Sequence, residues 1–128
     1  MTHKASVLIV DDNRDAADLL GEALRTCGYA VAVAHTSFDA LARLDSFHPD
    51  AALLDIGLPQ LDGYQLAREL HARLPALPLI AVTGYGQAAD RQRALEAGFA
   101  EHFVKPATIT DVVATLENLV RSNKASEQ

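Results

Sequence analysis

Residues 51–59, Ala-Ala-Leu-Leu-Asp-Ile-Gly-Leu-Pro, join a short apolar run to a carboxylate and then to a glycine and a proline. Consecutive apolar residues predict a buried strand, and Gly57 and Pro59 predict a loop at its carboxyl end. Parallel sheets bind their ligands at that edge, so Asp55 is a candidate functional residue. The competing interpretation is that Asp55 only caps the loop, which is a common role of aspartate.

The length and composition of the chain indicate one globular domain. It has 128 residues, of which 49% are hydrophobic, so it can form a core without disulfides. The formal net charge of −6 argues against nucleic-acid or anionic-membrane binding and is compatible with binding a cation. Cys27 is the single cysteine, which excludes an internal disulfide and fits a reducing compartment. Without a long apolar run or a signal peptide, we expect a cytoplasmic protein with no membrane insertion.

Short apolar runs alternate with stretches of helical periodicity along the whole chain. The runs cover residues 7–10, 30–34, 51–54, 79–82 and 102–104. Four of the helical stretches carry an apolar face, formed in chain order by Ala16, Leu20, Ala23, Leu24 and Cys27; by Ala40, Leu41, Leu44 and Phe47; by Leu66, Ala67, Leu70 and Leu74; and by Ile109, Val112, Val113, Leu116 and Val120. This alternation predicts an α/β fold with a doubly wound five-stranded parallel sheet. We adopt the flavodoxin-like (βα)5 strand order 2-1-3-4-5, which is common for such sheets.

The remaining helical stretch, about residues 87–97, differs because its inner face is mostly small. Ala88, Ala94, Leu95 and Ala97 form that face and bury little apolar area. We therefore expect this helix to be the least firmly held, and loosely held elements are where switching motion tends to occur.

Capping residues and composition predict the boundaries. We expect Gly28 to end the first helix, Asp62 to cap the third, and Thr108 or Thr110 to cap the fifth. Residues 1–121 are predicted to form the domain, followed by a flexible C-terminal tail at 122–128.

Polar residues follow four of the five predicted strands. In chain order they are Asp11-Asp12, Asp55, Thr83-Gly84 and Lys105-Pro106. His35 follows the second strand, which lies at an edge, and has no comparable cluster around it. In the adopted strand order the first and third strands flank the switch point, so we expect these side chains to converge on one crevice.

Carboxylates gathered in one crevice need a counter-charge. At about 4 Å and an effective dielectric near 20, each pair repels by roughly 4 kcal/mol, which Mg²⁺ and the Lys105 ammonium can offset. This set suits phosphoryl transfer onto a carboxylate, with Thr83 donating a hydrogen bond to a phosphoryl oxygen and Gly84 leaving the approach open. Single-residue alternatives remain: Asp11 or Asp12 as a helix cap, and Lys105 as a solvated lysine. No glycine-rich phosphate loop is present, which disfavours nucleotide binding.

These residues resemble the motif set of the response-regulator receiver domain of two-component signalling. The resemblance runs from about residue 5 to residue 120 and includes, in family order and spacing, Asp11-Asp12, Asp55, Leu58-Pro59, Asp62-Gly63, Thr83 and Lys105-Pro106. It implies that Asp55 accepts a phosphoryl group from the phosphohistidine of a histidine kinase or a histidine phosphotransfer domain. It also implies that Asp12, Asp55 and the Gly57 carbonyl bind Mg²⁺ directly, with Asp11 helping through water. A cis peptide between Lys105 and Pro106 is implied as well.

One position departs from the family pattern. Three residues before Lys105, receiver domains usually carry Tyr or Phe, the aromatic residue that moves with the threonine, and this chain has His102. We interpret Thr83 and His102 as the switch pair. The fourth helix, fifth strand and fifth helix would then form the output face for a downstream protein. The alternative is that His102 is only a surface histidine on an edge strand. The other histidines are scattered and indicate no metal site.

Three classes of function remain. The first is a phosphorylatable signalling domain, not a conventional enzyme, which acts alone or as the receiver of a hybrid histidine kinase; phosphorylation-dependent dimerisation is compatible with it. Because few residues follow Pro106, we expect no DNA-binding module as an output domain. The second is a phosphatase with an aspartyl-phosphate intermediate, but Gly57 stands two residues after Asp55, where such an enzyme usually has a second acid. The third is a degenerate receiver that binds partners without phosphate, which the intact acids, Thr83 and Lys105 argue against.

Overall fold

The fold is a parallel sheet between two layers of helices. The computed structural model describes residues 4–56, 63–83, 88–104 and 107–126. Within these ranges the sheet has five parallel strands in the order β2-β1-β3-β4-β5. Their bounds are β1 Ser6–Val10, β2 Ala30–Ala34, β3 Ala51–Asp55, β4 Leu79–Thr83 and β5 Glu101–Val104. The predicted α/β class and strand order are therefore confirmed.

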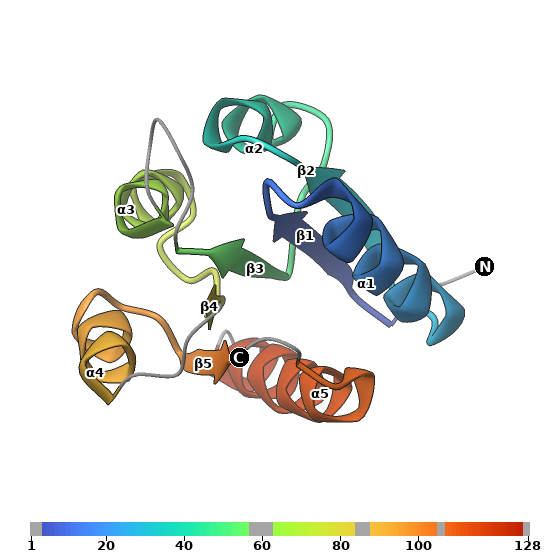
Figure 1. The fold of residues 1–128 in the computed structure, drawn as a ribbon. Helices are drawn as coiled ribbons and strands as arrows, with labels where there is room; N and C mark the ends of the chain where they lie inside the picture. Colours follow the sequence, from blue (N-terminus) through green and yellow to red (C-terminus); the bar gives the residue numbers. More distant parts are fainter. Residues whose placement is uncertain (1–3, 57–62, 84–87, 105–106, 127–128) are drawn as a thin grey trace.

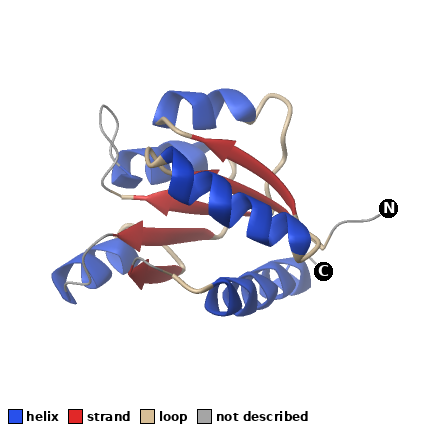
Figure 2. Ribbon diagram, turned by 45° about the vertical axis from the view of Figure 1, so that its right-hand side comes forward, coloured by secondary structure: helices blue, strands red, loops and turns tan. Residues whose placement is uncertain are grey.

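Helices cover both faces of this sheet. In the described ranges they are α1 Arg14–Thr26, α2 Ser37–Arg43, α3 Gly63–Arg73, α4 Ala88–Glu96 and α5 Ile109–Ser126. Figure 1 shows α1 and α5 on one side of the strands and α2, α3 and α4 on the other. The sheet, red in Figure 2, runs between the two layers. No helix of this described part is long and apolar enough to span a membrane.

The core consists of two apolar clusters separated by the sheet. Alternate strand residues face opposite sides, so Ile9 and Leu53 join the cluster under α1 and α5. Leu8 and Leu54 join the cluster under α2, α3 and α4. All four of these side chains are at most 2% exposed. Burial on both faces explains why the three central strands, β1, β3 and β4, are nearly continuous apolar runs in the sequence.

Helix α1 begins and ends at identifiable residues. The side-chain oxygen of Asn13 accepts a hydrogen bond from the Ala16 N–H at 3.1 Å, so Asn13 is the N-cap. The interpretation of Asp11 or Asp12 as the cap is therefore wrong. At the other end Gly28 has a φ of 101°, a left-handed conformation that glycine adopts without strain, as predicted for the helix stop.

The inner face of α1 is the predicted one in part. Leu24 is buried, and Leu20 and Cys27 pack against the same cluster, as expected. Ala16 is exposed, and Ala17 and Gly21 are buried in addition. Gly21 explains the difference, because a Cβ atom there would lie 3.0 Å from the Val33 Cγ2 atom. The missing side chain lets the helix lie close against β2, and periodicity of apolar residues does not count a glycine as part of the inner face.

The end of α5 lies beyond the predicted domain boundary at residue 121. The helix continues to Ser126 and so includes residues 122–126 of the segment assigned to a flexible tail. This stretch contains no glycine or proline to stop it. At the start of α5, the Thr108 Oγ1 atom accepts a hydrogen bond from the Asp111 N–H at 3.2 Å, which selects Thr108 from the two cap candidates. The predicted cap of α3, Asp62, lies outside the described residues.

Helix α4 is anchored differently from the prediction. Ala94 is fully buried as expected, but Leu95 is 46% exposed and does not belong to the inner face. The large apolar contact comes instead from Phe99, just after the helix, which is 3% exposed. Its ring meets the Tyr64 ring of α3 edge to face, with centroids 6.1 Å apart. That α4 is the least firmly held helix stays a prediction.

Candidate functional site

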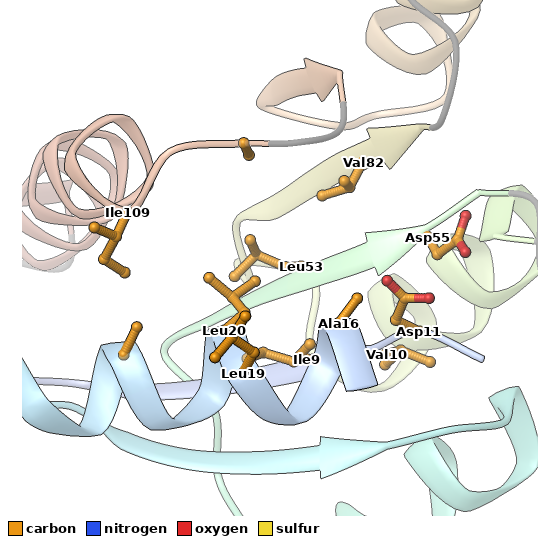
Figure 3. A pocket seen from close by; sticks show the side chains of 12 residues that line it. Ile9, Val10, Asp11, Ala16, Leu19, Leu20, Leu53, Asp55, Val82 and Ile109 are labelled. Carbon is orange, nitrogen blue, oxygen red and sulfur yellow. The ribbon is translucent and has the colours of Figure 1, made fainter. Parts of the chain in front are cut away.

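Three carboxylates meet at the carboxyl ends of β1 and β3. These strands are direct neighbours, with Val10 paired to Leu54, so the residues that follow them lie side by side. Ligand oxygens of Asp11, Asp12 and Asp55 all lie within 4.8 Å of one another. Figure 3 shows Asp11 and Asp55 at this strand edge. The predicted convergence of the three carboxylates is confirmed, and their roles stay predictions.

The three acids differ in burial. Asp11 is 8% exposed, Asp55 is partly buried and Asp12 is exposed. Their ligand oxygens are at most 4.8 Å apart; at that separation and an effective dielectric near 20 two charges repel by roughly 3.5 kcal/mol, and solvent screening lowers this at Asp12. Hard divalent cations prefer such a set of carboxylate oxygens. The residues of the cluster therefore fit the predicted magnesium site.

The loop after β1 is held by Asp11 and by a residue that sequence reasoning left without a role. The Asp11 Oδ1 atom accepts a hydrogen bond from the Asn13 N–H at 2.9 Å. The Asp11 carbonyl oxygen lies 3.2 Å from His35 Nδ1. A carbonyl can only accept, so His35 Nδ1 carries the proton in this hydrogen bond. The available signal was that His35 follows a strand at the same sheet edge as the acids.

The predicted switch pair is in contact. Thr83 ends β4 and is 8% exposed, and its Oγ1 atom lies 3.1 Å from His102 Nε2. His102 itself is half-buried on β5. A direct hydrogen bond to Thr83 favours the interpretation of His102 as a switch residue over that of a surface histidine.

Several predicted site residues lie outside the described part of the chain. They are Gly57, Leu58, Pro59, Asp62, Gly84, Lys105 and Pro106. The Gly57 carbonyl as a metal ligand, the Lys105 ammonium and the cis peptide before Pro106 therefore stay predictions.

An apolar cavity of about 390 Å³ adjoins the acids. Figure 3 shows Leu20, Leu53 and Ile109 along its apolar part, and Asp11 and Asp55 at its other end. Leu19 on α1 also lines it and is 71% exposed. A molecule that approaches Asp55 over α1 therefore meets apolar surface beside the carboxylates.

Comparison with known proteins identifies the class. The profile of the response regulator receiver domain matches residues 7–117. The chain therefore belongs to the response regulator receiver domain family, whose members are signalling domains of two-component systems.

Individual relatives agree with this assignment. The chain is 32% identical over 121 residues to the response regulator MprA of Mycobacterium avium, which covers 94% of this chain and 53% of that protein. It thus spans about half the length of the curated relatives it matches. It resembles the crystal structure of a CheY-like receiver domain protein from Methanospirillum hungatei, with a TM-score of 0.88, 29% identity, and coverage of 95% of this chain and 98% of the other. NtrX from Brucella abortus gives a TM-score of 0.91 and 28% identity over 96% of this chain and 28% of that chain.

Proposed function

We propose that Asp55 accepts a phosphoryl group from the phosphohistidine of a histidine kinase or a histidine phosphotransfer domain. A carboxylate oxygen of Asp55 forms the new bond to phosphorus while the bond from phosphorus to the histidine nitrogen breaks, and its electron pair stays on that nitrogen. The carboxylate cluster carries this proposal. Asp55 ends β3, which lies in the sheet between β1, the strand followed by the neighbouring acids, and β4, the strand that ends in Thr83.

The acids around Asp55 provide the electrostatic part of the site. Asp11, Asp12 and Asp55 are the described residues that would hold Mg²⁺, and the Gly57 carbonyl is the further ligand that the family resemblance implies. When bound, the cation neutralises charge on the carboxylates and on the transferring group. Thr83 donates its hydroxyl proton to a phosphoryl oxygen, and Lys105 supplies a counter-charge.

Labelling with a small phosphoryl donor tests the acceptor. Incubation with acetyl phosphate and Mg²⁺ should add the mass of one phosphoryl group. The bond that attaches this group to the chain should be stable in acid and labile in base. Asp55→Asn should abolish the added mass. Asp45→Asn removes an exposed acid just after α2, outside the cluster, and should label like the parent chain. Full labelling of the Asp55→Asn protein at another residue would show that the acceptor is wrong.

We also propose that the face formed by α4, β5 and α5 contacts the downstream protein. Leu95 on α4 and Val104 on β5 are 46% and 42% exposed, so this face offers apolar surface to a partner. Thr83 lies on the adjacent strand β4, one strand away from the surface. Phosphorylation can therefore reach the face through few intervening side chains.

Backbone NMR with beryllofluoride, a phosphoryl mimic, tests the output face. Chemical-shift changes should spread from Asp55 through Thr83 to residues 88–97 and His102. In the Thr83→Ala protein they should stay within the active-site loops. If the changes in the parent chain never leave those loops, the output lies on another face.

A further inference from the structure

The contact between Thr83 and His102 is a diagonal pair across neighbouring parallel strands. Ala81 pairs with His102, and Thr83 pairs with Val104, so the two residues are offset by two positions. Val82 and Phe103 pack into the cluster under α1 and α5. Alternation therefore places Thr83 and His102 on the opposite side of the sheet, which α4 covers. A long side chain reaches a diagonal neighbour, and here the Oγ1 and Nε2 atoms lie 3.1 Å apart.

The hydroxyl of Thr83 has one proton and two lone pairs, which limits what the pair can do. If Thr83 donates to an unprotonated Nε2 atom, it has no proton left for a phosphoryl oxygen. If Nε2 carries a proton, Thr83 can accept from His102 and donate to the phosphoryl group at the same time. A Phe side chain at position 102 would impose no such condition, because it neither donates nor accepts.

We propose that His102 is a positioning residue whose Nε2 proton aims the Thr83 hydroxyl at the phosphoryl group. In the phosphorylated chain the hydrogen bonds run from His102 Nε2–H to Thr83 Oγ1, and from Thr83 Oγ1–H to a phosphoryl oxygen. When the Thr83 hydroxyl moves, the His102 imidazole moves with it because the two groups are hydrogen-bonded. The imidazole does not merely fill the space that Thr83 leaves. This inference rests on the proposed phosphorylation of Asp55.

His102 needs only water as a source and acceptor of protons to carry a proton on Nε2. A neutral imidazole with its proton on Nδ1 must release that proton to water and take one up on Nε2 before it can donate. An imidazolium already has both. In either form the phosphorylated state requires a proton on Nε2, and this requirement can be observed directly.

Two other histidines provide internal standards for NMR of the ring nitrogens. His71 Nε2 lies 3.0 Å from the carbonyl oxygen of Leu77, so it is the protonated nitrogen of that ring. His35 has its proton on the other ring position, Nδ1, because this atom bonds the carbonyl oxygen of Asp11 at 3.2 Å, and its Nε2 atom lies 3.7 Å from Asp18 Oδ1. Long-range ¹H–¹⁵N spectra of the free chain therefore contain a protonated Nε2 atom in His71 and a protonated Nδ1 atom in His35 for comparison.

The first test compares His102 in the beryllofluoride complexes of the parent chain and of Thr83→Val, which removes the hydroxyl at nearly constant shape. In the parent complex we expect His102 to have a protonated Nε2 atom, with the same cross-peak pattern as His71. In the Thr83→Val complex the chemical shift of His102 Nε2 should differ from that in the parent complex. His71 should be the same in both. An unprotonated Nε2 atom in the parent complex, or a His102 signal indifferent to Thr83→Val, would overturn the proposal.

The second test is a double-mutant cycle with matched amides at position 102. His102→Gln places a terminal amide near the position of Nε2, from where it can donate to Thr83, whereas the side chain in His102→Asn is too short. In the parent chain and in the His102→Gln protein, Thr83→Val should weaken beryllofluoride affinity by at least about twofold more than it does in the His102→Asn protein. A factor of about two corresponds to the low end of measured coupling between contacting residues. An equal penalty in all three backgrounds would contradict the proposal.

These tests separate failure of the inference from failure of the proposed function. Acetyl phosphate labelling of the His102→Asn protein at Asp55 should persist, because His102 acts through Thr83 and not on phosphorus. Absence of labelling in the parent chain would sink phosphorylation of Asp55 itself. Labelling without coupling between Thr83 and residue 102 would sink only the positioning role.

Discussion

Gly63 lies directly against the backbone of Ile56, at the point where α3 begins. A Cβ atom on Gly63 would be 2.4 Å from the Ile56 Cα atom and 2.9 Å from the Asp55 carbonyl oxygen. Backbone atoms cannot move aside as a flexible side chain can. The start of α3 is thereby fixed against the residue that follows Asp55, which links this helix to the phosphorylation site.

Gly63→Ala should therefore destabilise the fold by about 1–3 kcal/mol, the usual cost of overpacking. Urea unfolding followed by circular dichroism measures it. Gly21→Ala is the comparison variant, because its Cβ atom would meet side chains and not backbone, with Val33 Cγ2 nearest at 3.0 Å, and its gain in helix propensity should offset part of the cost. Equal losses for both variants would contradict the special role of the Ile56 contact.

Mg²⁺ should stabilise the chain by relieving repulsion among Asp11, Asp12 and Asp55. At ten times the dissociation constant, linkage gives about 1.4 kcal/mol. Asp12→Ala should remove most of this gain and make the metal-free chain more stable, because a functional cluster of like charges opposes stability. Thermal melts with Mg²⁺ and with chelator measure both effects, and Asp45→Ala should keep the parent response. If Asp12→Ala left the Mg²⁺ response unchanged, the metal site would be wrong.

Lys105→Ala should separate metal binding from signalling. The lysine is predicted to neutralise the phosphoryl group and not to bind the cation, so the Mg²⁺-dependent rise in melting temperature should remain. The beryllofluoride-induced shifts of residues 92–97 should shrink. Loss of the Mg²⁺ response would instead place the ammonium among the groups that maintain the metal site.

Two arginines cover the free edge of β2, the outer strand of the described sheet. Arg25 Nη2 donates to the Val31 carbonyl oxygen at 3.1 Å, and Arg43 Nη2 donates to the Val33 carbonyl oxygen at 3.2 Å. These are alternate carbonyls of the strand, which would otherwise be available to pair with a strand of another molecule.

The double variant Arg25→Ala, Arg43→Ala should therefore associate with itself more readily than the parent chain. Light scattering during a concentration series measures the change. Arg68→Ala, which removes an exposed arginine of α3, alters net charge without uncovering the edge and provides a control for half of the charge change. Unchanged association of the double variant would show that the arginines do not protect the edge.

Much of the site could be predicted because each strand, and the polar residue that follows it, can be recognised from neighbouring residues in the sequence. The strand at residues 30–34 was predicted with the bounds that β2 has, since β-branched residues and a preceding glycine are local signals. Asp11, Asp12 and Asp55 could be placed together because the carboxyl ends of parallel strands share one edge. A strand order and a residue count were sufficient for this, and no side-chain conformation was needed.

The tertiary structure alone decided the contacts that depend on rotation and offset between elements. Gly21 on the inner face of α1, and Leu95 on the outer face of α4, follow from how each helix lies on the sheet. The hydrogen bonds of His35 with Asp11 and of His102 with Thr83 join residues 24 and 19 positions apart. Such contacts follow from side-chain direction and from the register between strands, and a linear pattern of apolar and polar residues contains neither.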